Sequence, residues 1–434
     1  MAGLGGLLYG VDFGVIAAAE PYMKALGVYS DAQISHIVGA VLLGGLLSSI
    51  TAGWLCDFFG RKKMIVASSA MFLIAIPVVS LSLDSLGALF AGRVLQGMSA
   101  GYMAVVMPMY LAETLPPEIR GRGTGVFQFC LGLGLVVAAG AGCLVAMVYG
   151  ASDTANAAGQ VAAWGANFWW TMVPVTVLFL GALRLPESPV WVKGLQEGTN
   201  VTDVTNVTLP RRSLFSRRYV VPFLIACLVL TLNKTTGMSS FTSYLVTILH
   251  SAGFEGMFAN WGQLAVKLTN MLATLGAVAL VDRKGRTWLL KVGTAGMTVG
   301  LAAIGAVFLS IERFGVEANN FTGFLALLAF FFMQVFYALG PGVCVWLVLS
   351  ELMPTRIRAN GMAIALFMNQ LVAWGLASWF RPWVAAWGWS SMFFFFAANG
   401  VLYFITALFL PETKGKSLEE LEHLFDRRHE TTTD

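Results

Sequence analysis

Charged residues lie inside apolar stretches of this sequence, where they are costly and therefore point to chemistry. Asp12 and Arg93 each interrupt such a stretch. A charge at the centre of a bilayer costs at least about 2.5 kcal/mol, so it is a functional hypothesis by default. A guanidinium keeps a neighbouring carboxylate ionised, whereas burial without that partner favours the protonated acid. The pair therefore has the chemistry of a proton switch, with a purely structural ion pair between two helices as the alternative.

A third charge, Lys234, lies in the polar stretch LNKTTGMSSFTSYL. An ammonium group donates hydrogen bonds but accepts none. Lys234 is expected to donate to the oxygens of a neutral solute, with the capture of a carboxylate or phosphate on an anionic solute as the alternative. Gly237 would permit local unwinding that exposes backbone to a ligand. Lys267 is expected near the outer membrane face, with its ammonium reaching the interface, rather than at the solute site.

Composition identifies the elements that must position these charges. Of the 434 residues, 57% are hydrophobic and 12% are charged, and the mean hydropathy is +0.74. Soluble domains carry about 25% charged residues, so the chain is expected to be a membrane protein with many spans. The net charge of +4 argues against nucleic acid as a partner. Metal-ligand spacings, phosphate-binding loops and nucleophile elbows are missing, so we expect no enzyme, metal or cofactor.

Twelve segments are apolar and long enough to be membrane helices, which predicts an all-α membrane protein. They cover residues 2–24, 33–55, 64–83, 89–111, 124–150, 165–184, 220–248, 260–281, 288–311, 323–352, 361–387 and 390–410. Most of the 27 basic residues fall between spans on one side, whereas Lys24, Arg313 and Arg381 are assigned to the opposite loops. The positive-inside rule then places both termini in the cytoplasm.

The two halves of the chain repeat each other. The string GWLCDFFGRKK is echoed by ALVDRKGR, with Asp57 and Asp282 225 residues apart, and AETLPPEIRG is echoed by SELMPTRIRA, with Glu113 and Glu351 238 residues apart. Two pseudo-symmetric bundles with a site between them are the working parts of alternating access. The predicted units are a bundle over 1–184, a cytoplasmic linker over 185–219, a bundle over 220–410 and a cytoplasmic tail over 411–434.

The repeated charges lie at the predicted cytoplasmic helix ends, where ion pairs between helices would hold an inner gate shut. Positive-inside anchoring and helix capping are the alternative roles. The candidate gate residues are Asp57, Arg61, Glu113, Arg120, Glu187, Asp282, Arg286, Glu351, Arg358 and Glu412.

Several strings together resemble the sugar porter family of the major facilitator superfamily over nearly the whole chain. They are GLLYGVDFGVI, DFFGRKK, GRVLQG, PMYLAETLPPEIRGRGTGVFQF, LPESP, DRKGR, WLVLSELMPTRIR and LPETKGKSLEELE. The resemblance implies two six-helix bundles that carry a sugar or polyol between them. In proton-coupled members similar to the bacterial xylose symporter, an Asp and an Arg occupy the Asp12 and Arg93 positions, and uniporters have an uncharged residue at the former.

The same resemblance implies the solute-binding positions. Paired Gln residues and a later Asn, usual in the family, are here Asn233, Lys234 and Ser239, and Gln370 stands where a second Trp is common. Tyr9 and Phe13 flank Asp12 and are expected to wall the site. The candidate solute-binding residues are Gln128, Asn233, Lys234, Ser239, Asn270, Trp346, Asn369 and Gln370.

The sequence therefore predicts a secondary active transporter for a sugar or sugar-like solute, with proton symport through Asp12 and Arg93. A sugar-acid symporter that uses Lys234 and a facilitative uniporter remain alternatives, and a transporter-like nutrient sensor is the least favoured. The expected setting is a bacterial inner membrane, with the chain as a monomer whose partners are the solute, protons and the lipid bilayer.

Overall fold

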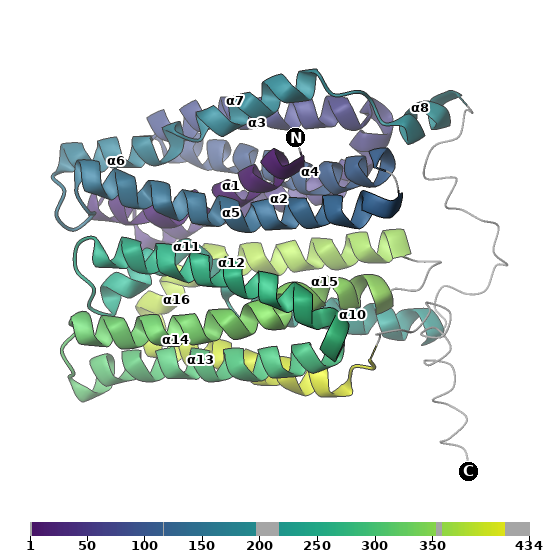
Figure 1. Cartoon of the computed structure of the whole chain (residues 1–434). Coiled ribbons are helices and arrows are strands. Elements are labelled where there is room, and N and C mark those ends of the chain that lie inside the picture. The colour runs from purple at the N-terminus through teal and green to yellow at the C-terminus, as the bar shows by residue number, and fades with distance from the viewer. Residues whose placement is uncertain (1, 116, 197–216, 353–357, 413–434) are drawn as a thin grey trace, which may run out of the picture.

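The computed structural model describes residues 2–115, 117–196, 217–352 and 358–412. All regular elements among these residues are helices, and the prediction of an all-α membrane protein is confirmed. The helices form two bundles stacked side by side, one from each half of the chain (Figure 1).

The first bundle contains seven helices, which provide six spans. They are α1 (Ala2–Ala25), α2 (Asp31–Phe59), α3 (Arg61–Leu81), α4 (Leu86–Thr114), α5 (Pro117–Tyr149), α6 (Ala157–Trp169) and α7 (Met172–Leu183). Together, α6 and α7 form the sixth span, Ala157–Leu183. The short helix α8 (Pro189–Gln196) follows in the predicted linker.

The second bundle is built from helices that are broken more often. They are α10 (Arg217–Thr235), α11 (Met238–Ser251), α12 (Phe258–Lys284), α13 (Arg286–Phe314), α14 (Asn320–Leu339), α15 (Pro341–Leu352) and α16 (Arg358–Phe409). Within α16, Gly388 has φ 82° and ψ 164°, so this stretch is two helices joined at a sharp turn.

The described residues contain eleven segments long and apolar enough to cross a membrane. One of them spans the turn at Gly388, and counting it as two helices gives the twelve spans that were predicted. The sixth predicted span, 165–184, was placed too late, since α6 already begins at Ala157. Asn156 caps that helix by accepting a 2.8 Å hydrogen bond from the amide of Gly159, a signal that a hydropathy window does not register.

Two glycines interrupt spans of the second bundle, and one of them is Gly237, where local unwinding was expected. Gly237 separates α10 from α11 with φ +79°, a left-handed conformation that glycine adopts without strain. Gly340, with φ −114° and ψ −86°, separates α14 from α15, which opens with Pro341. The amide of Asn233 donates a 3.3 Å hydrogen bond to the carbonyl of Pro341, so the two breaks lie side by side.

Small residues bring α1 and α5 into close contact, which sets the position of Asp12. A Cβ atom on Gly10 would lie 2.0 Å from the carbonyl oxygen of Leu131, and one on Gly134 would lie 2.1 Å from that of Leu7. Such helix contacts through small residues are typical of membrane bundles. With the backbones of α1 and α5 touching, the side chains on the other face of α1 point toward α4 and the second bundle.

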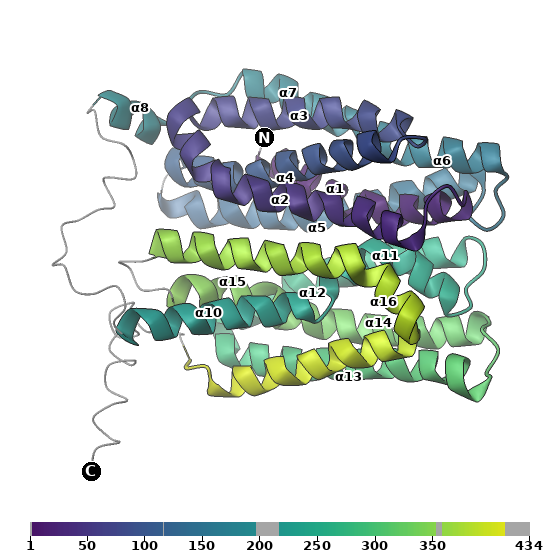
Figure 2. The ribbon, with the colours of Figure 1, turned by 180° about the vertical axis from the view of Figure 1, so that it is seen from behind.

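The bundles meet along three helix pairs: α2 with the first part of α16, α5 with α12, and α1 with α11 (Figure 2). The end that carries the connections 26–30, 150–156 and 252–257 is called the hairpin end here. The opposite end carries Gly60, Gly285 and the segment 184–188, and is called the linker end. Figure 1 shows the hairpin end on the left and the linker end on the right.

Candidate functional site

A cavity of about 230 Å³ lies between the two bundles. Its walls come from α1 and α5 of the first bundle and from α10, α11, α12, α14, α15 and α16 of the second. The breaks at Gly237 and Gly340 lie next to it, because Met238 and Gly342 are among its lining residues. The two halves of the chain therefore share one internal site.

Five of the eight predicted solute-binding residues line this cavity. They are Gln128, Lys234, Ser239, Asn270 and Gln370. Tyr9 and Phe13 of α1 also form part of its wall, at the positions expected from their place beside Asp12. The Lys234 ammonium donates a 3.5 Å hydrogen bond to the hydroxyl of Ser239 across the Gly237 break.

Two predicted residues do not reach the cavity. Asn233 is buried and donates to the carbonyl of Pro341, and Asn369 is buried and donates at 3.0 Å to the carbonyl of Leu230. Each immediately precedes a lining residue, and neighbours along a helix face different directions. Both side chains join helices of the second bundle to each other. The side chain of Trp346, in α15, lies outside the described residues.

The expectation for Lys267 was wrong. Its side chain is only 4% exposed and lines the cavity, instead of reaching a membrane surface. Lys267, Asn270 and Thr274 are spaced by three and four residues along α12, so they lie on the same face and all line the cavity. Lys267 and Lys234 thus enter one site from two different helices.

Besides Thr274, three polar lining residues were not predicted from the sequence: Thr242, Gln334 and Tyr337. Gln334 carried a usable signal, since it is the one amide in the apolar run FLALLAFFFMQVFYAL. Thr242 and Tyr337 carried none, because threonine and tyrosine are common in membrane helices. Which face of α11 or α14 meets the cavity is decided by packing.

Asp12 and Arg93 meet in the interior of the first bundle. The Arg93 Nη1 atom lies 3.9 Å from Asp12 Oδ1, and the side chains of Arg93 and Asp12 are 1% and 0% exposed. The same Nη1 atom donates a 2.8 Å hydrogen bond to Gln96, whereas neither oxygen of Asp12 accepts a hydrogen bond from a described residue. The pair is thus a buried ion pair held at long range, with a carboxylate free to bind another donor.

A small void of about 10 Å³ lies beside this pair, lined by Asp12, Arg93 and, from the second bundle, Ser243. Phe13 lines both this void and the large cavity. Phe13 is therefore a wall residue that the void beside Asp12 and the cavity have in common, at the contact between the bundles.

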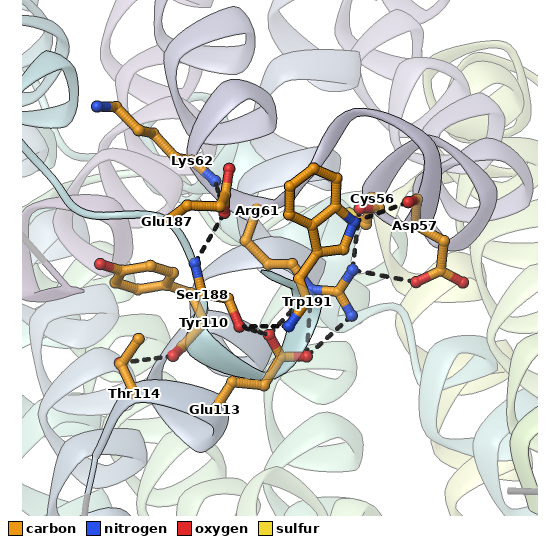
Figure 3. Close-up of polar contacts among 10 residues, drawn as sticks. All are labelled: Cys56, Asp57, Arg61, Lys62, Tyr110, Glu113, Thr114, Glu187, Ser188 and Trp191. Atoms are coloured by element: carbon orange, nitrogen blue, oxygen red, sulfur yellow. Dashed lines mark hydrogen bonds and ion pairs between the residues drawn. The ribbon is translucent and has the colours of Figure 1, made fainter. Parts of the chain in front are cut away.

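At the linker end, Arg61 is the centre of a polar cluster (Figure 3). Its side chain is buried and pairs with Glu113 of α4 at 2.9 Å and with Asp57 of α2 at 3.1 Å. The Ser188 hydroxyl donates to Glu113, and the Trp191 indole donates at 2.8 Å to the carbonyl of Asp57. The cluster joins α2, α3 and α4 to the start of the linker.

Glu187 and Glu412, which are 225 residues apart in the matching strings LPESP and LPETKG, make equivalent contacts. Glu187 accepts a 2.9 Å hydrogen bond from the backbone amide of Lys62, at the first turn of α3. Glu412 accepts from the amide of Arg286 at 3.0 Å and from that of the next residue at 3.1 Å, at the first turn of α13. A carboxylate is stabilised at a helix N-terminus, so the two repeats use the same cap.

The glycines before these helices also have the same conformation. Gly60 has φ 91° and ψ 163°, and Gly285 has φ 92° and ψ 159°. A Cβ atom on either glycine would lie within 2.7 Å of the capping carboxylate. The two repeats thus have the same backbone geometry at this glycine. The side chains of four candidate gate residues lie outside the described residues: Arg120, Asp282, Glu351 and Arg358.

At the hairpin end, Arg381 connects the two bundles. It lies within α16 and is 5% exposed, so its assignment to a loop was wrong. Its guanidinium pairs with Glu20 of α1 and Asp31 of α2, and its amide donates at 3.1 Å to the hydroxyl of Ser35. Thr247 of α11 donates at 2.5 Å to Glu20. We call Arg381, Glu20, Asp31 and Thr247 the hairpin latch.

Comparisons with known proteins agree with this architecture. The family model described as "Sugar (and other) transporter" matches residues 1–200 and 195–425. The arabinose-proton symporter of Bacillus subtilis (strain 168) is 27% identical, over 98% of this chain and 93% of that protein. The galactose-proton symporter of Escherichia coli (strain K12) is 27% identical, over 97% and 92%.

The fold is shared with a solved structure as well. The inward open conformation of the xylose transporter XylE from E. coli superposes with a TM-score of 0.80, covering 98% of each chain at 23% identity.

Proposed function

We propose that this chain, which belongs to the sugar porter family of the major facilitator superfamily, moves a sugar-like solute across a membrane together with protons. It is a multi-pass membrane transporter and not an enzyme. The observation that carries the proposal is the buried pair of Asp12 and Arg93 next to a cavity that both bundles share. Two relatives are named as sugar-proton symporters, which supports the same function.

Asp12 is the proposed proton carrier. An isolated carboxylate in a dry interior favours its protonated form, and a guanidinium nearby favours the ionised form. The Arg93–Asp12 ion pair has a distance of 3.9 Å and no direct hydrogen bond, so no hydrogen bond between the two side chains has to break when the helices move. Asp12 would then release its proton when Arg93 approaches and bind one when Arg93 withdraws.

Phe13 is the proposed link between proton and solute. Its ring lines both the void beside Asp12 and the cavity in which the solute would bind. A solute that displaces the ring changes the packing around the carboxylate one residue away. This arrangement couples occupancy of the cavity to protonation without direct contact between the two.

In the proposed transport cycle, the bundles rock about the cavity. The hairpin latch joins them at one end, and the hydrogen bonds between the bundles that join described residues all lie toward this end. This supports a state closed at the hairpin end and accessible from the linker end. The basic residues favour the cytoplasm on the linker side.

The polar clusters at the linker end are the proposed gate for the opposite state. Within the described residues, Arg61, Glu113 and Asp57 join helices of the first bundle, and Glu187 and Glu412 cap α3 and α13. They would keep each bundle rigid as its linker end approaches the other. The proposed gate also includes Arg286 and the four residues whose side chains are not described, Arg120, Asp282, Glu351 and Arg358.

The solute would bind between neutral donors and acceptors from both bundles. Gln128 of α5 lines the cavity together with Asn270 of α12 and Gln370 of α16. Amides both donate and accept, which suits the hydroxyl groups of a sugar. Asn233 and Asn369 would position α10, and Trp346 stays a proposed contact from the family resemblance.

Purified protein in liposomes that contain a pH-sensitive dye tests the proposal. Solute added outside should acidify the lumen, and Asp12→Asn should abolish the signal while solute exchange continues. Solute uptake without any proton signal in the parent protein would instead favour a facilitative uniporter, with Asp12 and Arg93 as a structural pair.

A further inference from the structure

Two lysines from different helices line the cavity between the bundles. Because a sugar is neutral, even one ammonium group in its binding site would be unusual. Lys234 lies in the last turn of α10, just before the Gly237 break, and Lys267 lies within α12. The described residues that line the cavity include no aspartate or glutamate. The polar remainder of the lining consists of neutral amides and hydroxyls.

Buried ammonium groups need a counter-charge. Removing a charge from water is costly unless it is paired and hydrogen-bonded, and two like charges in one site add repulsion. Asp12, which lines the small void beside the cavity, already faces Arg93. Among the described residues that line the cavity and the void beside it, the charged side chains are therefore three cations and one carboxylate.

We propose that the transported solute carries an oxyanion, a carboxylate or a phosphate, which binds between Lys234 and Lys267. This rests on the proposed function, because it names the solute class of the same cavity. The volume of about 230 Å³ holds roughly seven or eight waters, which suits a solute the size of one monosaccharide. A monosaccharide acid combines this size with hydroxyls for Gln128, Asn270 and Gln334 and a carboxylate for the lysines.

The net charge moved in each transport cycle provides a second test of the solute class. If Asp12 carries one proton with each monovalent anion, the transported charge sums to zero. A membrane potential then neither drives nor opposes net uptake, whereas one proton with a neutral sugar would carry a positive charge inward. The electrical response of transport therefore distinguishes the two solute classes.

Counterflow in proteoliposomes tests the solute class without requiring proton coupling. The probes are a labelled hexuronate, an aldonate, a hexose phosphate and the parent neutral hexoses. We expect exchange of the hexuronate, competition by the aldonate and no competition by neutral hexoses. Exchange of the hexose phosphate alone would support the oxyanion site and show that the solute carries a phosphate and not a carboxylate.

Exchange of neutral hexoses in preference to the acids would overturn the inference and leave the proposed sugar symport intact. Exchange of none of the probes, neutral or acidic, would overturn both. In the potential test, net uptake of the acid should be equal with and without a potassium diffusion potential, and a strong stimulation by inside-negative potential would contradict the inference.

Lysine variants provide the matched test. Lys234→Gln and Lys267→Gln should each raise the half-saturation concentration for the acid about tenfold to a hundredfold, the usual range for a lost charged hydrogen bond. Lys234→Arg and Lys267→Arg keep the charge and should keep the preference for acid over neutral hexose. That ratio does not depend on how much protein folds. Lys24→Gln, an exposed lysine at the end of α1, is the control and should change nothing.

Discussion

Arg381 of α16 forms an ion pair with Glu20 of α1, and the two residues are 361 positions apart in the chain. Glu20 is fully buried and Arg381 nearly so. The pair joins the last third of the second bundle to the first helix of the first bundle, at the end opposite the linker. This ion pair is one of several polar contacts that join the two bundles at the hairpin end.

Breaking this contact should shift the molecule away from the state closed at the hairpin end. In Arg381→Gln, Glu20 would stay buried without its cation, a change that costs about 3–5 kcal/mol in other buried pairs. We expect faster amide hydrogen exchange in the last turns of α1 and α11. Arg313→Gln, an exposed arginine near the same end, is the control.

Glu20→Gln should have the same effect, since it removes the other partner of the pair. The double variant should then cost clearly less than the sum of the single variants, because contacting residues are not additive. Additive effects would show that Arg381 and Glu20 act separately and would remove the hairpin latch as a unit.

Asp12→Asn should uncouple the transporter. The Asn amide cannot bind and release a proton as the carboxyl group does, so accumulation driven by a pH gradient should be lost, while equilibrium exchange of solute remains. Uptake with an acid-outside gradient and counterflow are the two measurements. Asp84→Asn, an exposed acid in the α3–α4 connection, should keep both activities. Gradient-driven accumulation by Asp12→Asn would exclude Asp12 as the proton carrier.

Arg61→Gln should weaken the linker end of the first bundle. The variant leaves Glu113 and Asp57 without the guanidinium that joins α2, α3 and α4. Because both carboxylates are partly exposed, the loss is expected to be at least about 1 kcal/mol, between the values of exposed and buried pairs. Thermal unfolding in detergent measures it. Lys63→Gln, an exposed neighbour, should have an unfolding midpoint equal to that of the parent.

Gly237→Ala should disturb the break beside the cavity. A left-handed residue other than glycine costs about 1–2 kcal/mol, and the added Cβ would lie 2.8 Å from the Phe396 ring. We expect lower thermal stability and weaker solute binding. Gly276→Ala in α12, where a Cβ would meet nothing within 4 Å, should be neutral or stabilising. Equal behaviour of the two variants would show that the break does not require its left-handed glycine.

The spans and the repeat could be predicted because both are visible in the local sequence. The spans are long apolar runs, and the repeat is a set of matching strings. An apolar run long enough to cross a bilayer has few alternatives to a helix, and Gly237 and Gly340 interrupt their runs as local chemistry requires. Glu187 and Glu412 occupy matching places in the repeat, and their capping contacts with α3 and α13 are local to each bundle.

Lys267 marks the limit of such reasoning. A lysine in a membrane helix can reach an interface or face an interior site, and sequence spacing alone does not tell which face of the helix is covered. Asn369 and Gln370 show the same limit at adjacent positions, where one joins two helices and the other lines the cavity. The rotation of each helix about its own axis decides these cases.

By itself, the sequence determined that the chain spans a membrane as helices, that its halves repeat, and that Asp12, Arg93 and Lys234 are charges within those helices. These features follow from composition and spacing, because the backbone polar groups of a chain in lipid must be hydrogen-bonded within the protein, which few structures achieve. Only the tertiary structure decided that Lys267 joins Lys234 in one cavity, that Asp12 lies 3.9 Å from Arg93, and that Arg381 joins α16 to α1. Those contacts depend on how helices far apart in the chain rotate and pack, which no local pattern encodes.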